Sequence, residues 1–148
     1  MRTNDKIGGG FYFCDPFKNY KNCWFKLGTF GGDDPSRRMA NLRKSHNNIQ
    51  MECYLPMPKA IKAEYEAVEA HTKMMMLRRF PELTHMGNDH FAFITNKEEY
   101  KTRLEEYRAA AMEIALKYCN DYTIPYDAII WPNLKKGGVH YKHRKKRV

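Results

Sequence analysis

Residues that could do chemistry gather in two parts of this chain. The first half carries an ordered series, with Gly-Phe-Tyr at residues 10–12, Lys-Leu-Gly at 26–28 and Pro-Ser-Arg-Arg-Met at 35–39, before an acidic stretch around Glu69. The series combines a phenol, an ammonium, a guanidinium and a carboxylate. Carboxylates bind divalent metal ions, and lysine and arginine offset the charge of phosphate groups. Phosphate chemistry is therefore within reach of these residue types.

The second part is the C-terminal end, whose residues 135–147 hold seven basic and no acidic side chains: Lys135, Lys136, Lys142, Arg144, Lys145, Lys146 and Arg147. The chain has 26 Lys and Arg against 17 Asp and Glu, a net charge of +9, so without these seven its body is nearly neutral. A basic run suits a nucleic-acid backbone through counterion release, a nuclear-import receptor or an acidic protein surface. The alternative is a solubilising, disordered end.

The elements that must position the first set follow from sequence pattern. Aromatic runs at 11–14 and 23–28 predict two strands joined by a short polar loop, as in an antiparallel hairpin. Asp34 is suited to cap a helix that begins near Pro35, whose Met39 and Leu42 face inward. Residues 49–55 alternate apolar and other side chains at period two, which predicts a third strand.

Pro-Met-Pro at 56–58 is expected to end that strand, and residues 59–79 to form one helix. Residues 91–94 predict a last strand. Residues 97–119 predict a long amphipathic helix, whose apolar stripe could pack on the protein's own sheet, on a partner chain or on a second copy of this chain. The stripe consists of Tyr100, Leu104, Tyr107, Ala111, Ile114 and Tyr118.

Together these elements predict an α+β fold, with a small three- to four-stranded mixed or antiparallel sheet flanked by helices, a long C-terminal helix and a basic tail. The expected organisation is a domain over 1–96, a helix and anchoring segment over 97–134 and a tail over 135–148. No apolar stretch approaches the roughly 20 residues that span a bilayer, and no signal peptide is recognised. Four widely spaced cysteines predict free thiols in an intracellular, reducing compartment.

Taken in this order, the motifs resemble the GIY-YIG endonuclease superfamily, over roughly residues 9–95. The likeness is closest to the viral and phage branch, whose second motif reads Lys-Ile-Gly. In that superfamily two short strands carry the named motifs and the following helix supplies an arginine. The resemblance implies a metal-dependent endonuclease that hydrolyses DNA phosphodiester bonds with Mg²⁺ or Mn²⁺, to whose duplex affinity the basic tail would add.

The resemblance also implies roles for single residues. Tyr12 corresponds to the tyrosine that orients or deprotonates the attacking water. Lys26 stands where most members carry a second tyrosine, and as a cation it would lower the pKa of Tyr12 or touch a phosphate. Arg38, which Met39 follows directly as an apolar core position, would brace the scissile phosphate. Gly31 and Gly32 make the spacing before Arg38 slightly longer than usual.

The metal ligand implied by the resemblance is Glu69, with Glu66 as the alternative. The family usually places a histidine one turn after this glutamate, whereas His71 follows Glu69 by two residues. Asn88, which precedes the last aromatic strand, would support the site. A single carboxylate would leave Mg²⁺ coordinated mostly by water and substrate oxygens, as this ion tolerates.

Two other interpretations remain open. The chain could have kept the fold and lost catalysis, serving as a DNA-binding or structural component, for instance inside a virion. Alternatively, the motifs are accidental, and the same residues have only structural roles in a small α+β protein with a basic end. Geometry discriminates between them, because a nuclease requires Tyr12, Lys26, Arg38 and a glutamate to converge on one concave, positively charged surface.

Overall fold

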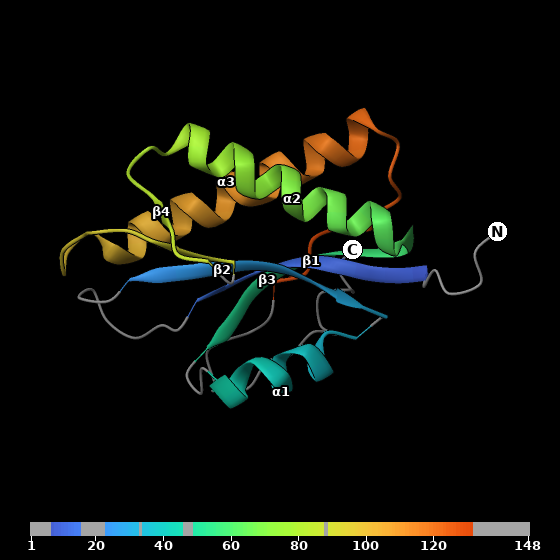
Figure 1. Cartoon of the computed structure of the whole chain (residues 1–148), viewed down its shortest axis with the longest axis horizontal. Coiled ribbons are helices and arrows are strands. Elements are labelled where there is room, and N and C mark those ends of the chain that lie inside the picture. The colour runs from blue at the N-terminus through green and yellow to red at the C-terminus, as the bar shows by residue number, and fades with distance from the viewer. Residues whose placement is uncertain (1–6, 16–22, 33, 46–48, 88, 132–148) are drawn as a thin grey trace.

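The fold is a three-layer arrangement in which one sheet separates two helices from a third (Figure 1). The computed structural model describes residues 7–15, 23–32, 34–45, 49–87 and 89–131. Along the chain the elements are β1 (Ile7–Asp15), β2 (Trp24–Gly31), α1 (Ser36–Ser45), β3 (Gln50–Ile61), α2 (Lys62–Arg79), β4 (Thr84–His85), β5 (His90–Ala92) and α3 (Tyr100–Asp121).

The sheet is antiparallel throughout, in the order β3-β1-β2-β5-β4. The α+β prediction is confirmed, as is the antiparallel pairing of the first two strands. The described sheet has five strands where three or four were expected, because β4 is only two residues long. A strand of that length shows no period-two pattern in the sequence.

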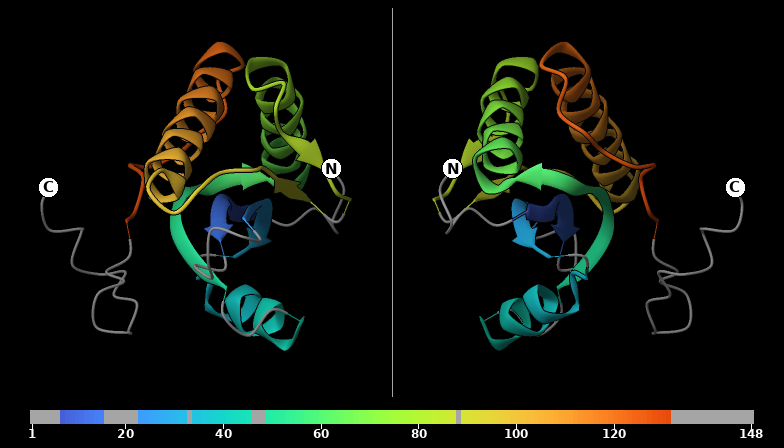
Figure 2. Two further views of the ribbon diagram at one scale, coloured as in Figure 1. Left: turned by 90° about the vertical axis from the view of Figure 1, so that its left-hand side faces the viewer. Right: turned by 90° about the vertical axis from the view of Figure 1, so that its right-hand side faces the viewer.

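Two hydrophobic cores form because side chains alternate between the faces of a strand. Phe11 and Phe13 of β1 point into the core beneath α2 and α3. Tyr12 and Cys14 point to the opposite face, into a smaller core that Met39 of α1 covers. Figure 2 shows α2 and α3 side by side above the sheet and α1 on the other face. The alternation therefore places Tyr12 on the same side as the helix that carries Arg38.

The prediction that Pro-Met-Pro ends the third strand is wrong, because β3 continues through these residues to Ile61. The reason is the direction in which the backbone N–H groups of β3 face, either toward β1 or away from it. The Tyr54 N–H faces outward and donates to the carbonyl of Ile130 at 3.0 Å. Pro56 and Pro58 share the alternation of Tyr54, so the N–H groups that they lack are not needed for the ladder with β1. The helix consequently begins at Lys62 and not at residue 59.

The long C-terminal helix is present as α3, and it packs on α2 and the sheet of its own chain. Tyr107 and Ala111 of the predicted stripe are fully buried, and they belong to the same core as Phe11 and Phe13. After α3, the chain returns to the outer edge of β3, where Ile130 forms a β-bridge with Tyr54. The apolar stripe is therefore used within this protein's own core.

The prediction of buried thiols is confirmed, since all four cysteines are buried and none of them forms a disulfide bond with another. A search of the helices in the described ranges finds none with the length and apolarity that a bilayer crossing requires.

Candidate active site at the edge of β2

Tyr12 occupies the centre of β1 with its side chain fully buried in the α1 core. Its partner across the ladder is Gly28 of β2. The phenol ring lies over that glycine so closely that a Cβ there would collide with its Oη and Cζ atoms. The glycine of the Lys-Leu-Gly motif therefore provides the space in which the Tyr12 ring lies.

Arg38 approaches this phenol from α1. The start of α1 is stabilised by Asp34, which accepts hydrogen bonds from the backbone N–H and the hydroxyl of Ser36, at 2.9 and 2.7 Å. Half-buried Arg38 lies two residues after Ser36, and its Nε donates to the Tyr12 Oη at 3.4 Å, near the limit for a hydrogen bond. The neighbouring Arg37 is exposed. Arg38, and not Lys26, is the cation in contact with the phenol.

Lys26 lies on the same face of β2 as Gly28 and is almost fully buried. Its Nζ forms an ion pair with the Asp89 Oδ2 at 3.6 Å. Asp89 sits in the turn before β5 with a positive φ of 69°, a conformation that aspartate tolerates better than most residues. In the described ladder, Lys26 of β2 pairs with His90, the first residue of β5. The ion pair between Lys26 and Asp89 therefore lies at the end of this ladder.

Glu69 of α2 reaches the same edge from the other face. Its Oε2 lies 2.5 Å from the Lys73 Nζ, and its Oε1 accepts a hydrogen bond from Thr29 of β2 at 3.3 Å. Lys73 is also paired with the Asp89 carboxylate. Glu66, the alternative ligand, is exposed and pairs with Lys62 at 3.7 Å. The geometry therefore separates the two glutamates, and only Glu69 is directed to the sheet.

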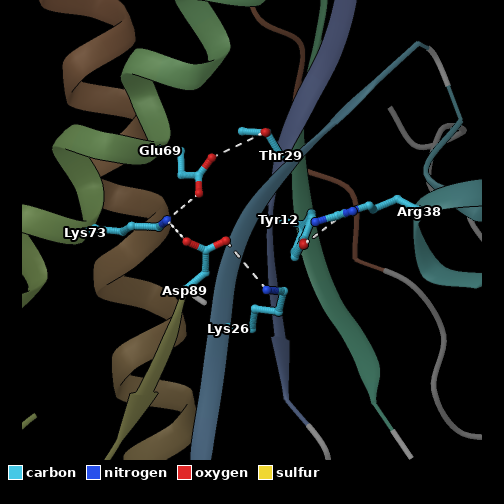
Figure 3. A network of polar contacts seen from close by, with 7 residues as sticks. All are labelled: Tyr12, Lys26, Thr29, Arg38, Glu69, Lys73 and Asp89. Atoms are coloured by element: carbon cyan, nitrogen blue, oxygen red, sulfur yellow. Dashed lines mark hydrogen bonds and ion pairs between the residues drawn. The ribbon is translucent and has the colours of Figure 1, made fainter. Parts of the chain in front are cut away.

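Figure 3 shows the resulting arrangement around β2, with Tyr12 and Arg38 on one side of the strand and Glu69 and Lys73 on the other. Four of the residues singled out from the sequence, which come from β1, β2, α1 and α2, lie on either side of this strand, and because Tyr12 and Lys26 are buried the four do not share one exposed surface. They form two groups. One is the Tyr12–Arg38 contact, and the other is a chain of ion pairs and hydrogen bonds that runs through Lys26, Asp89, Lys73, Glu69 and Thr29.

The electrostatics link the two groups. Burial raises the pKa of the Tyr12 phenol well above its ordinary value, the negative charge of Glu69 adds to this shift, and Arg38 opposes it. Burial also lowers the pKa of Lys26, which Arg38 lowers further while Asp89 acts in the opposite direction. The phenol therefore stays protonated at neutral pH, where it is able to donate a hydrogen bond.

Lys73 and Asp89 hold each other in the charged state. Burial acts to lower the pKa of Lys73, but hydrogen bonds to Asp89 and Glu69 outweigh it and raise the value. Burial likewise acts to raise the pKa of Asp89, but Lys73 and then Lys26 bring it below its ordinary value. Opposite charges in a partly desolvated setting thus stabilise one another.

Sequence reasoning missed Asp89, Lys73 and Thr29. One signal was available, because Lys73 follows Glu69 by four residues and side chains at that spacing are neighbours on a helix. Lys73 thus takes the place, one turn after the glutamate, where a histidine was expected. Asp89 adjoins Asn88, but its contact with Lys26 depends on the turn before β5. Asn88 itself and the seven basic tail residues lie outside the described residues.

The carboxylate oxygens of Glu69 and Asp89 are of the type that binds a hard divalent cation. Glu69 and Asp89 direct carboxylate oxygens at one common point, as Mg²⁺ or Mn²⁺ would require. That point is taken by the Lys73 ammonium. Across the described ranges, no three His, Cys, Asp or Glu side chains form a group able to hold a metal ion. Binding at Glu69 would therefore depend on two carboxylates, on water and on substrate oxygens.

Comparison of the chain with protein-family models, with curated proteins and with solved structures gave no match. The function is therefore inferred from the geometry of this site and from the chemistry of its residues.

Proposed function

We propose that this protein is a GIY-YIG-like, metal-dependent endonuclease that hydrolyses DNA phosphodiester bonds. The observation that carries the proposal is that Arg38 contacts Tyr12 on one side of β2, while Asp89 and Lys73 link Lys26 to Glu69 beside the same strand. Tyr12, Lys26, Arg38 and Glu69 come from four separate elements of the fold. The Gly28 that makes room for the phenol belongs to the same motif as Lys26.

Each residue has a task suited to its chemistry. A divalent cation held by Glu69, with Asp89 beside it, would offset the charge of the phosphodiester. The protonated Tyr12 phenol would orient the attacking water by a hydrogen bond, with Arg38 beside it. Arg38 would also direct its guanidinium at the scissile phosphate, because its Nε contact with Tyr12 leaves the terminal nitrogens for a second partner. Lys26 would hold Asp89 in place.

The proposed partner is DNA, with the tail from Lys135 to Arg147 supplying sequence-independent contacts to the phosphate backbone. Mg²⁺ or Mn²⁺ is the proposed cofactor.

A second candidate function is a DNA-binding or structural protein that keeps this fold without catalysis. The specific observation in its favour is that Tyr12 is fully buried and that both carboxylate oxygens of Glu69 are engaged by Lys73 and Thr29. On this alternative the edge of β2 is an internal polar network, and the basic tail alone makes the protein bind nucleic acid.

Plasmid nicking tests the proposal. The purified chain is incubated with supercoiled DNA at low salt, with Mg²⁺, with Mn²⁺ or with EDTA. The matched variants are Glu69→Ala and Glu66→Ala, which remove a carboxylate from the same helix, but at the edge of β2 in one case and in solvent in the other. Metal-dependent nicking that Glu69→Ala abolishes and Glu66→Ala retains supports the nuclease.

Arg38→Ala and Tyr12→Phe extend the test to the other face, with Arg37→Ala as the control for Arg38 because it is the exposed neighbour. Removing one preorganised donor to a transition state typically costs about a hundredfold or more in rate. A mobility shift without cleavage under any metal condition would instead favour the second candidate. Cleavage that survives Glu69→Ala would contradict the proposed mechanism.

A further inference from the structure

The position of Lys73 is unusual for a lysine on the surface of a helix. Its ammonium contacts two carboxylates at once, Glu69 one turn earlier on α2 and Asp89 in the turn before β5 (Figure 3). The side chains of Lys73 and Glu69 are only 17% and 16% exposed, and that of Asp89 is 32% exposed. This is a partly desolvated cluster, in which charges interact more strongly than at the open surface.

The same helix contains a natural comparison. Lys62 and Glu66 form a pair with the same four-residue spacing, but their side chains are 57% and 51% exposed and their charged atoms lie 3.7 Å apart. A pair of that kind contributes little, because solvent screens it. The closer and more buried Lys73 contacts therefore reflect the presence of a second carboxylate, which only the turn at Asp89 supplies.

Two carboxylates directed at one point repel each other unless a cation lies between them. Lys26 neutralises part of the charge of Asp89, at its other oxygen. The Lys73 ammonium lies at the point of convergence itself, which is where a divalent cation bound by both carboxylates would sit.

We propose that Lys73 is a tethered cation that competes with a divalent metal ion for Glu69 and Asp89. The ammonium keeps the two carboxylates together when no metal is bound, and a metal ion enters only when Lys73 withdraws. Metal affinity in the intact protein is therefore lower than the two carboxylates alone would give. This inference rests on the proposed function for the role of the metal, but the competition itself is a property of binding that needs no substrate.

The test measures Mn²⁺ binding to the full chain by electron paramagnetic resonance, without DNA. Lys73→Met removes the charge and keeps an unbranched side chain of similar length, whereas Lys73→Arg retains a cation. Lys62→Met is the matched control on the same helix. We expect Lys73→Met to bind Mn²⁺ at least about tenfold more tightly than the wild type. Lys73→Arg and Lys62→Met should bind Mn²⁺ with an affinity close to that of the wild type. Adding Glu69→Gln to Lys73→Met should remove the gain.

Thermal unfolding gives a second measurement that does not depend on activity. Without its cation, the Lys73→Met variant should be destabilised in EDTA and should recover on adding Mn²⁺, because a ligand of the folded state stabilises it. Equal Mn²⁺ affinity in wild type and Lys73→Met would overturn the inference. So would a gain that survives Glu69→Gln, or a Lys73→Met variant that stays unfolded in saturating Mn²⁺.

The two proposals fail in distinguishable ways. Metal-dependent cleavage by the wild type, together with unchanged Mn²⁺ affinity in Lys73→Met, would keep the nuclease and remove the tethered cation. Tighter Mn²⁺ binding by Lys73→Met, together with no cleavage by either protein, would do the reverse.

Discussion

The Tyr12 phenol keeps its place because the residue opposite it on β2 has no side chain. We predict that Gly28→Ala lowers the free energy of unfolding by about 1–3 kcal/mol, since the new methyl group would have to displace the Tyr12 ring. The ring would move away from Arg38, so metal-dependent nicking should fall as well. Urea denaturation and the plasmid assay measure the two effects.

Gly31→Ala is the control for this change, because it lies on the same strand and its methyl group would meet only the Tyr65 Oη, at 3.3 Å. A Gly28→Ala variant as stable as Gly31→Ala would show that the phenol is not confined by Gly28.

Tyr107 of α3 gives a prediction about pH. Burial raises the pKa of its phenol to about 12, although Arg103, which donates to the Oη at 2.7 Å, opposes the shift. In the unfolded chain this phenol ionises near pH 10, so between about pH 10 and 12 the unfolded chain loses a proton that the folded protein keeps. The contribution of the protonated Tyr107 phenol to the free energy of unfolding is therefore complete below about pH 10 and is lost as the pH rises to about 12.

We therefore predict that Tyr107→Phe makes the decline of unfolding free energy above pH 10 less steep, by up to about 1.4 kcal/mol per pH unit. Urea denaturation at pH values from 9 to 12 measures this slope. Tyr122→Phe, at an exposed tyrosine, should leave it unchanged. Identical slopes in wild type and Tyr107→Phe would contradict the assignment.

Among the elements, β3 contains an irregularity that joins it to α3. Its register with β1 shifts between Phe13 and Cys14, which pair with Cys53 and Met51, so that Glu52 is the extra residue of a bulge. The Glu52 side chain is 7% exposed, and its Oε1 accepts a hydrogen bond from Arg108 of α3 at 2.6 Å. The bulge thus directs a carboxylate into the interface between sheet and helix.

We predict that Arg108→Met lowers the free energy of unfolding by about 3–5 kcal/mol, because it leaves a buried carboxylate without its counter-charge. Adding Glu52→Met should restore most of the loss. Arg79→Met, which breaks an exposed pair with Glu113, should cost about 1 kcal/mol or less. Urea unfolding of the four proteins tests this. Equal losses in Arg108→Met and the double variant would indicate that packing, and not charge, accounts for the effect.

The same strand shows how an element can mislead sequence reasoning. The prolines at 56 and 58 were expected to end β3, because proline interrupts a ladder. Whether it does so depends on which side of the strand its nitrogen faces, and that is fixed by the pairing with β1 and by the return of the chain to Tyr54. The local sequence shows neither this pairing nor the return of the chain. It does show the period-two alternation of the residues before the prolines.

At the scale of the whole molecule, charge separates body from tail. We predict that replacing the seven tail residues Lys135, Lys136, Lys142, Arg144, Lys145, Lys146 and Arg147 by Gln weakens DNA binding. The dependence of log affinity on log salt concentration should become shallower by up to about 6, since each phosphate contact contributes about 0.9. Fluorescence anisotropy titrations at several salt concentrations measure this. Lys117→Gln, an exposed change on α3, is the control, and an unchanged slope would contradict the assignment.

The fold and the candidate site were predictable to different degrees. The α+β class and most elements follow from periodicity, because a strand or helix with one buried face has apolar residues at a regular spacing in the sequence. The network around Lys73 does not follow in this way. It joins α2 to a turn that comes after it in the chain, and ion pairs of this kind depend on where the turn lies in space. Tyr12, Lys26, Arg38 and Glu69 were found through an ordered set of motifs, and Asp89 belongs to none of them.

The solitary position of α1 has a consequence for motion. Among the described helices it alone covers its face of the sheet, and it does so chiefly through Met39 and Leu42. Such a helix can open locally at a smaller free-energy cost than the sheet beneath it. Each opening would let water reach Tyr12, which is fully buried while α1 is in place. Amide hydrogen exchange along α1 therefore reports how often the buried phenol becomes accessible to solvent.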